Sequence, residues 1–180
     1  MKTFEDLGVD PRLLQAIGEM GFVNPMPIQE MTIPHLLNED SDVVGLAQTG
    51  TGKTAAFGLP LLQRIDSERE VPQALIIAPT RELCLQIAGD LADFSKYMAG
   101  IRVLPVYGGS SIESQIKALR KGVQVIVATP GRLIDLIRRG VVHLDQVHTV
   151  ILDEADEMLN MGFTESINEI LAGVPAEKLR

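Results

Sequence analysis

The feature that most constrains the fold of this chain is a series of short, continuous apolar runs separated by stretches with helical spacing. The runs cover residues 42–48, 74–79, 102–107, 123–128 and 149–153. Because they do not alternate apolar with polar residues, strands formed by them must be covered on both faces, which is typical of a parallel sheet between helices. Helical patterns at residues 53–65, 82–98, 112–121 and 132–139 complete a strand–helix–strand rhythm. The sequence therefore predicts a doubly wound, mainly parallel α/β fold.

Two further helical patterns, at residues 12–20 and 27–37, precede the first predicted strand. We interpret residues 1–38 as appended N-terminal helices within the same fold. No repeat, low-complexity tract or linker interrupts the 180 residues, so we expect one domain over residues 1–180.

Composition and charge exclude several classes of protein. Lys2, Glu5 and Asp6 stand where a signal peptide would be apolar, and no run is long enough to span a membrane. We therefore expect a cytoplasmic protein without a membrane partner. The net charge of −8 argues against a broadly basic surface, so any contact with nucleic acid should be local. The single Cys84 is expected in the core, and three scattered histidines lack the spacing of zinc ligands.

A glycine-rich segment follows the first predicted strand and opens a helix, which is the context of a phosphate-binding loop. Its glycines allow backbone conformations that turn amide hydrogens inward, and the helix adds its positive end. The lysine supplies charge for the outer phosphates, and the last threonine offers a hydroxyl to Mg. The broad motif has glycine where this chain has alanine at its first position. The predicted loop is Ala47, Gln48, Thr49, Gly50, Thr51, Gly52, Lys53 and Thr54.

Two consecutive carboxylates, Asp153 and Glu154, end the last predicted strand. A carboxylate at that position can hold Mg through water, while its neighbour accepts a proton from the attacking water. We predict Asp153 as the metal residue and Glu154 as the base. An acidic helix N-terminus that stabilises its own dipole is the alternative interpretation. We expect the phosphate loop and both carboxylates to share a pocket for Mg-ATP.

Together these segments resemble the N-terminal RecA-like lobe of DEAD-box RNA helicases over nearly the whole chain. Asp153-Glu154-Ala155-Asp156 spells the family's name, and AQTGTGKT is the form of the phosphate loop that the family uses, which accounts for the alanine. Residues 21–29 resemble its adenine-reading element, although Met26 stands in place of an expected threonine. The resemblance implies that Phe4 stacks on the base and that Phe22 and Gln29 contribute to nucleotide binding. An amide that donates and accepts together suits adenine, so ATP is expected over GTP.

The residues after the other predicted strands match the RNA-facing elements of that family. Hydroxyls, free helix amides, close-approach glycines and arginines all suit a phosphodiester backbone, and none of these elements reads a base edge. We expect sequence-independent binding, with 2′-hydroxyl contacts favouring RNA. The predicted RNA-binding residues are Pro79, Thr80, Arg81, Glu82, Gln86, Gly108, Gly109, Thr129, Pro130, Gly131 and Arg132.

By this resemblance the whole protein is an ATP-dependent RNA helicase, in which a second RecA-like lobe supplies an arginine finger and half of each site. The sequence stops before the family's Ser-Ala-Thr strand, so we expect this chain to bind nucleotide with little or no hydrolysis. The missing strand would leave a slot in the sheet, which predicts self-association or a displaced segment. An ATP-dependent RNA clamp or assembly platform remains an alternative, as does a small-molecule kinase that shares the phosphate loop.

Overall fold

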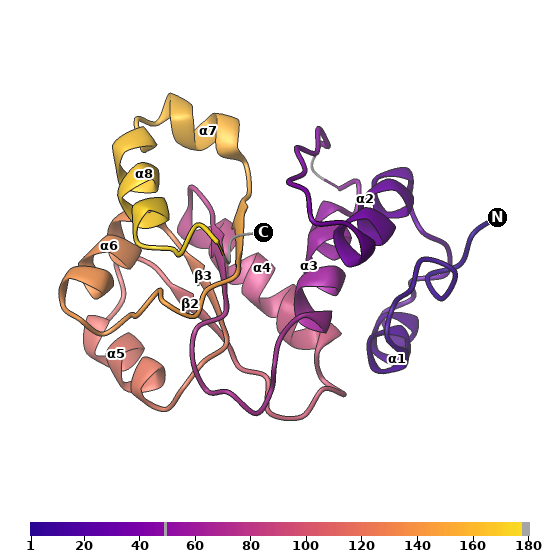
Figure 1. Ribbon diagram of the computed structural model, residues 1–180, viewed down its shortest axis with the longest axis horizontal. Coiled ribbons are helices and arrows are strands. Elements are labelled where there is room, and N and C mark those ends of the chain that lie inside the picture. Colours follow the sequence, from indigo (N-terminus) through magenta and orange to yellow (C-terminus); the bar gives the residue numbers. More distant parts are fainter. Residues whose placement is uncertain (49, 178–180) are drawn as a thin grey trace. The chain divides into compact units, whose positions relative to one another are not determined.

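The computed structural model describes residues 1–48 and 50–177, which form two compact units. Of the described residues, the first unit contains 1–65 and 90–99, and the second contains 66–89 and 100–177. Helix α4 (Arg81–Phe94) contributes residues 81–89 to the second unit and residues 90–94 to the first. Figure 1 colours the chain from its N-terminus to its C-terminus and labels most of its elements.

The first unit is helical. Helix α1 (Pro11–Glu19) begins at Asp10, whose carboxylate accepts a hydrogen bond from the backbone N–H of Arg12 at 2.8 Å, as an N-cap does. Helix α2 (Pro27–Asn38) packs against α3 (Lys53–Gln63). The two appended helices predicted from the sequence are therefore confirmed.

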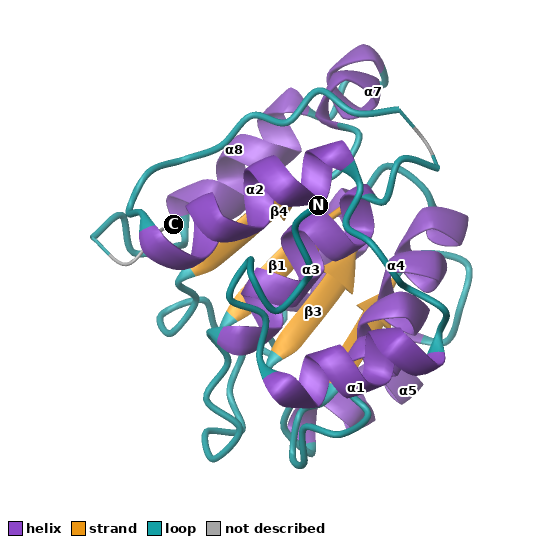
Figure 2. Cartoon of the chain, turned by 90° about the vertical axis from the view of Figure 1, so that its right-hand side faces the viewer, coloured by secondary structure: helices purple, strands orange, loops and turns teal. Residues whose placement is uncertain are grey.

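The second unit contains a four-stranded sheet. Its strands are β1 (Ala74–Ile77), β2 (Val103–Val106), β3 (Val125–Ala128) and β4 (Thr149–Leu152), in the order β2-β3-β1-β4. All three pairings are parallel, and Figure 2 shows the strands side by side. Every residue of the central strands β1 and β3 is buried, which confirms that both faces of the sheet are covered. The predicted fold class is confirmed.

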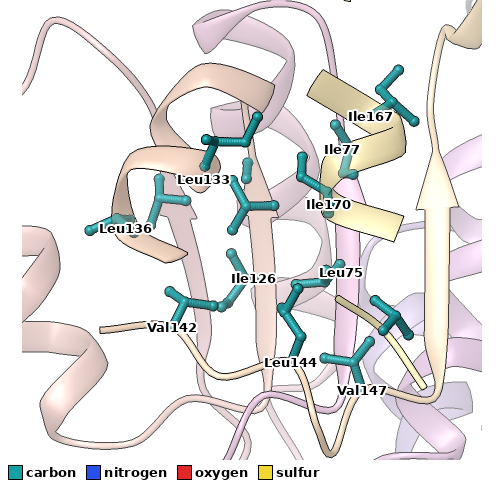
Figure 3. Packing of buried hydrophobic residues seen from close by; sticks show 14 of the residues in the cluster. Leu75, Ile77, Ile126, Leu133, Leu136, Val142, Leu144, Val147, Ile167 and Ile170 are labelled. Atoms are coloured by element: carbon teal, nitrogen blue, oxygen red, sulfur yellow. The ribbon is translucent and has the colours of Figure 1, made fainter. Parts of the chain in front are cut away.

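Helices of the second unit cover every second side chain of the central strands β1 and β3. The remaining helices are α5 (Ile112–Arg120), α6 (Pro130–Arg138), α7 (Ala155–Asn160) and α8 (Thr164–Ala172). Apolar side chains of α6 and α8 enclose Leu75, Ile77 and Ile126, as Figure 3 shows. This packing fixes the strands, and therefore the loops that leave their carboxyl ends.

The predicted strand at residues 42–48 is wrong for this structure. These residues are not in a strand, and the side chains of Val44 and Leu46 are 91% and 94% exposed. An extended segment becomes a strand only when a neighbour accepts and donates its backbone hydrogen bonds, and the described residues pair no strand with it. The apolar pattern was detected correctly, but it carried no information on whether a partner was present.

Candidate functional site

The predicted phosphate loop enters α3 through two glycines in the left-handed region. Gly50 has a φ of 82°, and Gly52, the N-cap of α3, has a φ of 78°. Both the backbone N–H and the hydroxyl of Thr51 donate to the carbonyl of Gln48, which curls the loop. Glycine adopts such φ values without steric cost, so the two positions explain why the motif requires that residue.

Lys53 and Thr54 form the first turn of α3, and both are half-buried. At this end of a helix the backbone N–H groups lack intrahelical partners and the helix dipole favours an anion. Buried Ala55, Ala56 and Leu59 anchor the same helix in the first unit. Ala47 is half-buried, and Thr49 lies outside the described residues. The described part of the loop therefore leads into a helix N-terminus, which is a context that favours an anion, and phosphate binding remains a prediction.

Gln29 is buried, with 2% of its surface exposed, rather than standing on the helix surface. Its Nε2 donates to the carbonyl of Gly52 at 3.0 Å, and its Oε1 accepts from the N–H of Met26 at 2.8 Å. An amide has two N–H donors and two acceptor lone pairs, so one of each remains for an adenine edge. The contact with Gly52 ties the adenine-reading segment to the phosphate loop. A glutamine at the third position of a helix is the sequence signal for part of this arrangement.

The predicted stacking aromatics take part in packing within the first unit. Phe4 is 4% exposed, and its ring centroid lies 6.1 Å from that of Phe22. Phe22 in turn meets Phe94 edge-on, with centroids 6.0 Å apart. Stacking of Phe4 on a base remains a prediction, and in this structure the Phe4 ring is covered.

The carboxyl ends of the four strands are aligned by backbone hydrogen bonds beyond the strands themselves. Asp153 N–H donates to Ile77, Ala78 N–H donates to Ala128, and Thr129 N–H donates to Val106, at 2.9, 3.0 and 3.1 Å. Parallel neighbours lie about 4.8 Å apart, so the residues that follow each strand form one row. The prediction that the acidic and RNA-facing segments leave the same sheet edge is confirmed within the second unit.

Asp153 and Glu154 stand at the end of β4. Asp153 is buried, and its Oδ1 accepts from the N–H of Glu154 at 3.0 Å. Among the described residues, Glu154 alone of the non-glycine residues has a positive φ, at 52°. Such a conformation costs about 1–3 kcal/mol and is enriched at functional sites. Glu154 also precedes α7, whose first turn holds Asp156 and Glu157, so the acidic helix start coexists with the predicted site.

The residues present suit Mg rather than a metal enclosed by protein. No group of three or more histidine, cysteine, aspartate or glutamate side chains gathers into a metal cluster among the described residues. Mg typically takes one or two carboxylates and completes its coordination with water and substrate phosphates. The carboxylate of Asp153 and the hydroxyl of Thr54 are hard oxygen donors of that kind.

The predicted RNA-facing residues lie in the loops that follow β1, β2 and β3 and in the first turns of α4 and α6, all in the second unit. Thr80 caps α4, since its hydroxyl accepts from the N–H of Leu83 at 3.2 Å. Arg81 is exposed, and its guanidinium carbon lies 4.9 Å from the centroid of the Tyr107 ring. Arg132 is half-buried and donates from Nη1 to Gln115 Oε1 at 2.9 Å. Glu82, Gln86, Gly108, Gly109 and Gly131 are exposed, Thr129 is half-buried, and Pro79 and Pro130 are buried.

Tyr107 and Gln115 were missed in the sequence analysis. Tyr107 directly precedes Gly108, and its proximity to a predicted glycine pair was a usable signal. Gln115 carried none, because its contact with Arg132 joins residues 17 apart in sequence.

Two other sequence expectations can be compared with the structure. Cys84 is buried as predicted, and burial raises the pKa of its thiol to about 12, which leaves no reactive thiolate at neutral pH. Within the described part of the chain, no helix combines the length and apolar character needed to cross a membrane.

Comparison with known proteins agrees with the geometry. A profile of the DEAD/DEAH box helicase family matches residues 26–179. The "ATP-dependent RNA helicase DeaD" of Buchnera aphidicola subsp. Acyrthosiphon pisum is 54% identical over 175 residues, which is 97% of this chain and 29% of that protein. The chain therefore spans less than a third of this relative's length.

Solved structures give the same result. The crystal structure of a DEAD box protein from the hyperthermophile Methanococcus jannaschii matches with a TM-score of 0.93 and 41% identity, over 98% of this chain and 48% of that one. A variant of S. cerevisiae Dbp5 bound to RNA and ADP BeF3 matches with a TM-score of 0.90 and 36% identity, over 99% and 45% of the two chains. With its phosphate loop, its Asp-Glu-Ala-Asp strand end and these matches, the chain belongs to the DEAD/DEAH box helicase family.

Proposed function

We propose that this chain is the ATP-binding lobe of an ATP-dependent RNA helicase, spanning residues 1–180 with the appended segment 1–38 in adenine recognition. The observation that carries the proposal is the glycine loop with φ values of 82° and 78° that leads into the N-terminus of α3, because the first N–H groups of a helix lack intrahelical partners and favour an anion. The relative named as an ATP-dependent RNA helicase supports the same activity.

In this proposal the protein holds the triphosphate by charge and orientation. Lys53 neutralises the outer phosphates, and the backbone amides of residues 52–54, at the start of α3, orient them. Thr54 and Asp153 hold Mg, largely through water, and Mg when bound offsets the negative charge of the phosphates. Glu154 accepts the proton of the attacking water as the base. Gln29, Phe4 and Phe22 act on the adenine side.

The RNA backbone is the proposed second ligand. The row formed by the ends of β1, β2 and β3 offers the hydroxyls of Thr80 and Thr129, the helix amides after them, and the cations Arg81 and Arg132. These groups bind phosphate and ribose rather than base edges, so binding is independent of sequence. The structure titled as Dbp5 bound to RNA and ADP BeF3 is consistent with such a ligand.

Alone, the chain should bind Mg-ATP with little or no hydrolysis, because a second RecA-like lobe of the same protein supplies transition-state stabilisation. The test is a multiple-turnover ATPase assay on this chain, with and without RNA. RNA-stimulated turnover by the isolated chain would contradict the proposal. In the full-length protein, a duplex-displacement assay separates an unwinding enzyme from an ATP-dependent RNA clamp, which requires the same two sites.

Self-association is proposed for the isolated chain. The segment 42–48 exposes Val44 and Leu46 outside any strand, and β4 has a partner strand on one edge only among the described residues. Unpaired edges with apolar residues pair readily with other chains. Light scattering should show species heavier than the 19.6 kDa monomer at high concentration, and a strict monomer would refute this part. A cytoplasmic location is also proposed, and imaging of a fluorescent fusion tests it.

A further inference from the structure

The loop between β2 and α5 is held by one buried side chain. Gln115, in the first turns of α5, is 5% exposed. Its Nε2 donates to the carbonyl of Tyr107 at 3.2 Å, and its Oε1 accepts from Arg132 Nη1 at 2.9 Å. A single amide therefore connects the end of β2 to an arginine of α6.

Arg132 is oriented by this contact. Its Nη1 also donates to the carbonyl of Ser110 at 3.2 Å, so both hydrogens of that nitrogen are directed at the protein. Within the described residues, Nη2 and Nε of Arg132 form no hydrogen bond. The planar guanidinium fixes the direction of these remaining donors once Nη1 is held. A pre-oriented donor pair loses less conformational freedom when it binds a phosphate.

The same loop holds the second arginine of the edge. The Arg81 guanidinium lies over the ring of Tyr107, at 4.9 Å from its centroid. Gly109 adjoins this arginine, since a Cβ built on it would lie 3.9 Å from Arg81 Nη1. Because Gln115 anchors the backbone of Tyr107, it also constrains the surface on which Arg81 rests.

A buried glutamine commonly serves packing alone, and this chain provides an example. Gln124 is fully buried, its Oε1 accepts from Arg102 N–H at 2.8 Å, and its Nε2 donates to the carbonyl of Gly100 at 2.9 Å. Both partners of Gln124 are backbone groups before β2, at the opposite end of the strands. Gln115 differs because its oxygen faces a cation at the predicted RNA edge.

We propose that Gln115 is a positioning residue for RNA binding, which orients Arg132 directly and Arg81 through Tyr107. This inference rests on the proposed function, since it assigns Gln115 a role in the RNA site described there. It predicts that the affinity for RNA depends on a residue that does not itself touch RNA.

The test substitutes Gln115→Glu in the full-length protein that carries this chain. The carboxylate has the same shape, loses the donor to Tyr107, and neutralises Arg132 by forming an ion pair with it. Binding of a short fluorescein-labelled oligouridine is measured by anisotropy with a non-hydrolysable ATP analogue over a series of salt concentrations. We expect an affinity about tenfold lower than that of the wild type, and a log–log salt slope smaller by about 0.7, the value of one phosphate contact on a single strand. The neutral Gln115→Met should lower affinity with an unchanged slope, because the charge of Arg132 stays.

The matched control is Gln124→Glu, the same substitution at a buried bridging glutamine away from this edge. It should lower the melting temperature and leave the RNA affinity and the salt slope as in the wild type. A double-mutant cycle with Arg132→Gln gives the readout that a packing role would not move. The effect of Gln115→Glu on RNA affinity should be clearly smaller once Arg132 is gone, because only the part that acts through Tyr107 and Arg81 then remains.

Wild-type affinity in folded Gln115→Glu and Gln115→Met would overturn the inference, as would an equal loss with and without Arg132. If Gln115→Glu does not fold, the Gln115→Met cycle with Arg132 decides by the same criterion. If the wild type does not bind oligouridine at all, the proposed function fails, and this inference fails with it.

Discussion

Substituting alanine at two glycines of the phosphate loop should have unequal effects on stability, although both glycines have the same backbone conformation. Gly50 and Gly52 have φ values of 82° and 78°, where an L-residue costs about 1–2 kcal/mol. A Cβ on Gly50 would meet nothing within 4 Å, so this strain is the whole expected cost. A Cβ on Gly52 would lie 2.3 Å from Gln29 Nε2 and 3.1 Å from Met26 Sδ, so the buried amide must move.

Moving that amide breaks its hydrogen bond to the carbonyl of Gly52, and disrupting a buried amide costs about 1–3 kcal/mol. We therefore expect Gly52→Ala to destabilise the chain by about 2–5 kcal/mol and Gly50→Ala by about 1–2 kcal/mol. Urea unfolding followed by far-UV circular dichroism measures both, since the chain has no tryptophan to serve as a fluorescence probe. Equal destabilisation by the two substitutions would refute the assigned role of Gln29 in holding the loop.

Two further predictions concern helices. Gly58→Ala in α3 should destabilise the chain by about 1–3 kcal/mol, because the added Cβ would lie 2.7 Å from Leu91 Cδ2. Gly89→Ala in α4 should stabilise it by about 0.5–1 kcal/mol, because the added Cβ meets nothing within 4 Å and alanine favours a helix over glycine. Thermal melts in which Gly58→Ala is the more stable variant would contradict this. At the start of α1, hydrogen bonds from the Arg12 side chain, and then from its backbone, lower the pKa of Asp10 below 3.8. The stabilisation from Asp10 is thus complete above pH 3.8 and declines as the pH falls through the lower pKa of the folded state. The free energy of unfolding of the wild type should therefore exceed that of Asp10→Ala by about 1 kcal/mol at neutral pH, and the difference should shrink in acid. A difference independent of pH argues against it.

The sequence predicted those parts of the fold that depend on local pattern. Continuous apolar character identified β1 to β4, because buried parallel strands need it along their whole length. The same criterion failed at residues 42–48, since apolar character does not reveal whether a neighbouring strand is available. Val44 and Leu46 are exposed because no neighbouring strand among the described residues pairs with this segment.

For the candidate site too, the features that follow from strand order could be predicted from the sequence, and contacts between distant residues could not. Parallel strands bring their carboxyl ends to one edge, so the shared row of Thr129, Asp153 and the residues after β1 followed from topology. Side-chain contacts between distant elements did not follow. The contact of Gln29 with Gly52 joins residues 23 apart in sequence, and the left-handed backbone of Glu154 leaves no trace in a residue pattern. Such features depend on the packed structure rather than on local preference.

Calorimetric titration of the chain with ATP, with and without Mg, tests the central claim most directly. The account predicts adenine-nucleotide binding that is strengthened by Mg, is lost in Lys53→Ala, and loses its Mg dependence in Asp153→Asn while nucleotide still binds. A folded wild-type chain without affinity for ATP, or an Asp153→Asn variant whose Mg dependence equals that of the wild type, would contradict it.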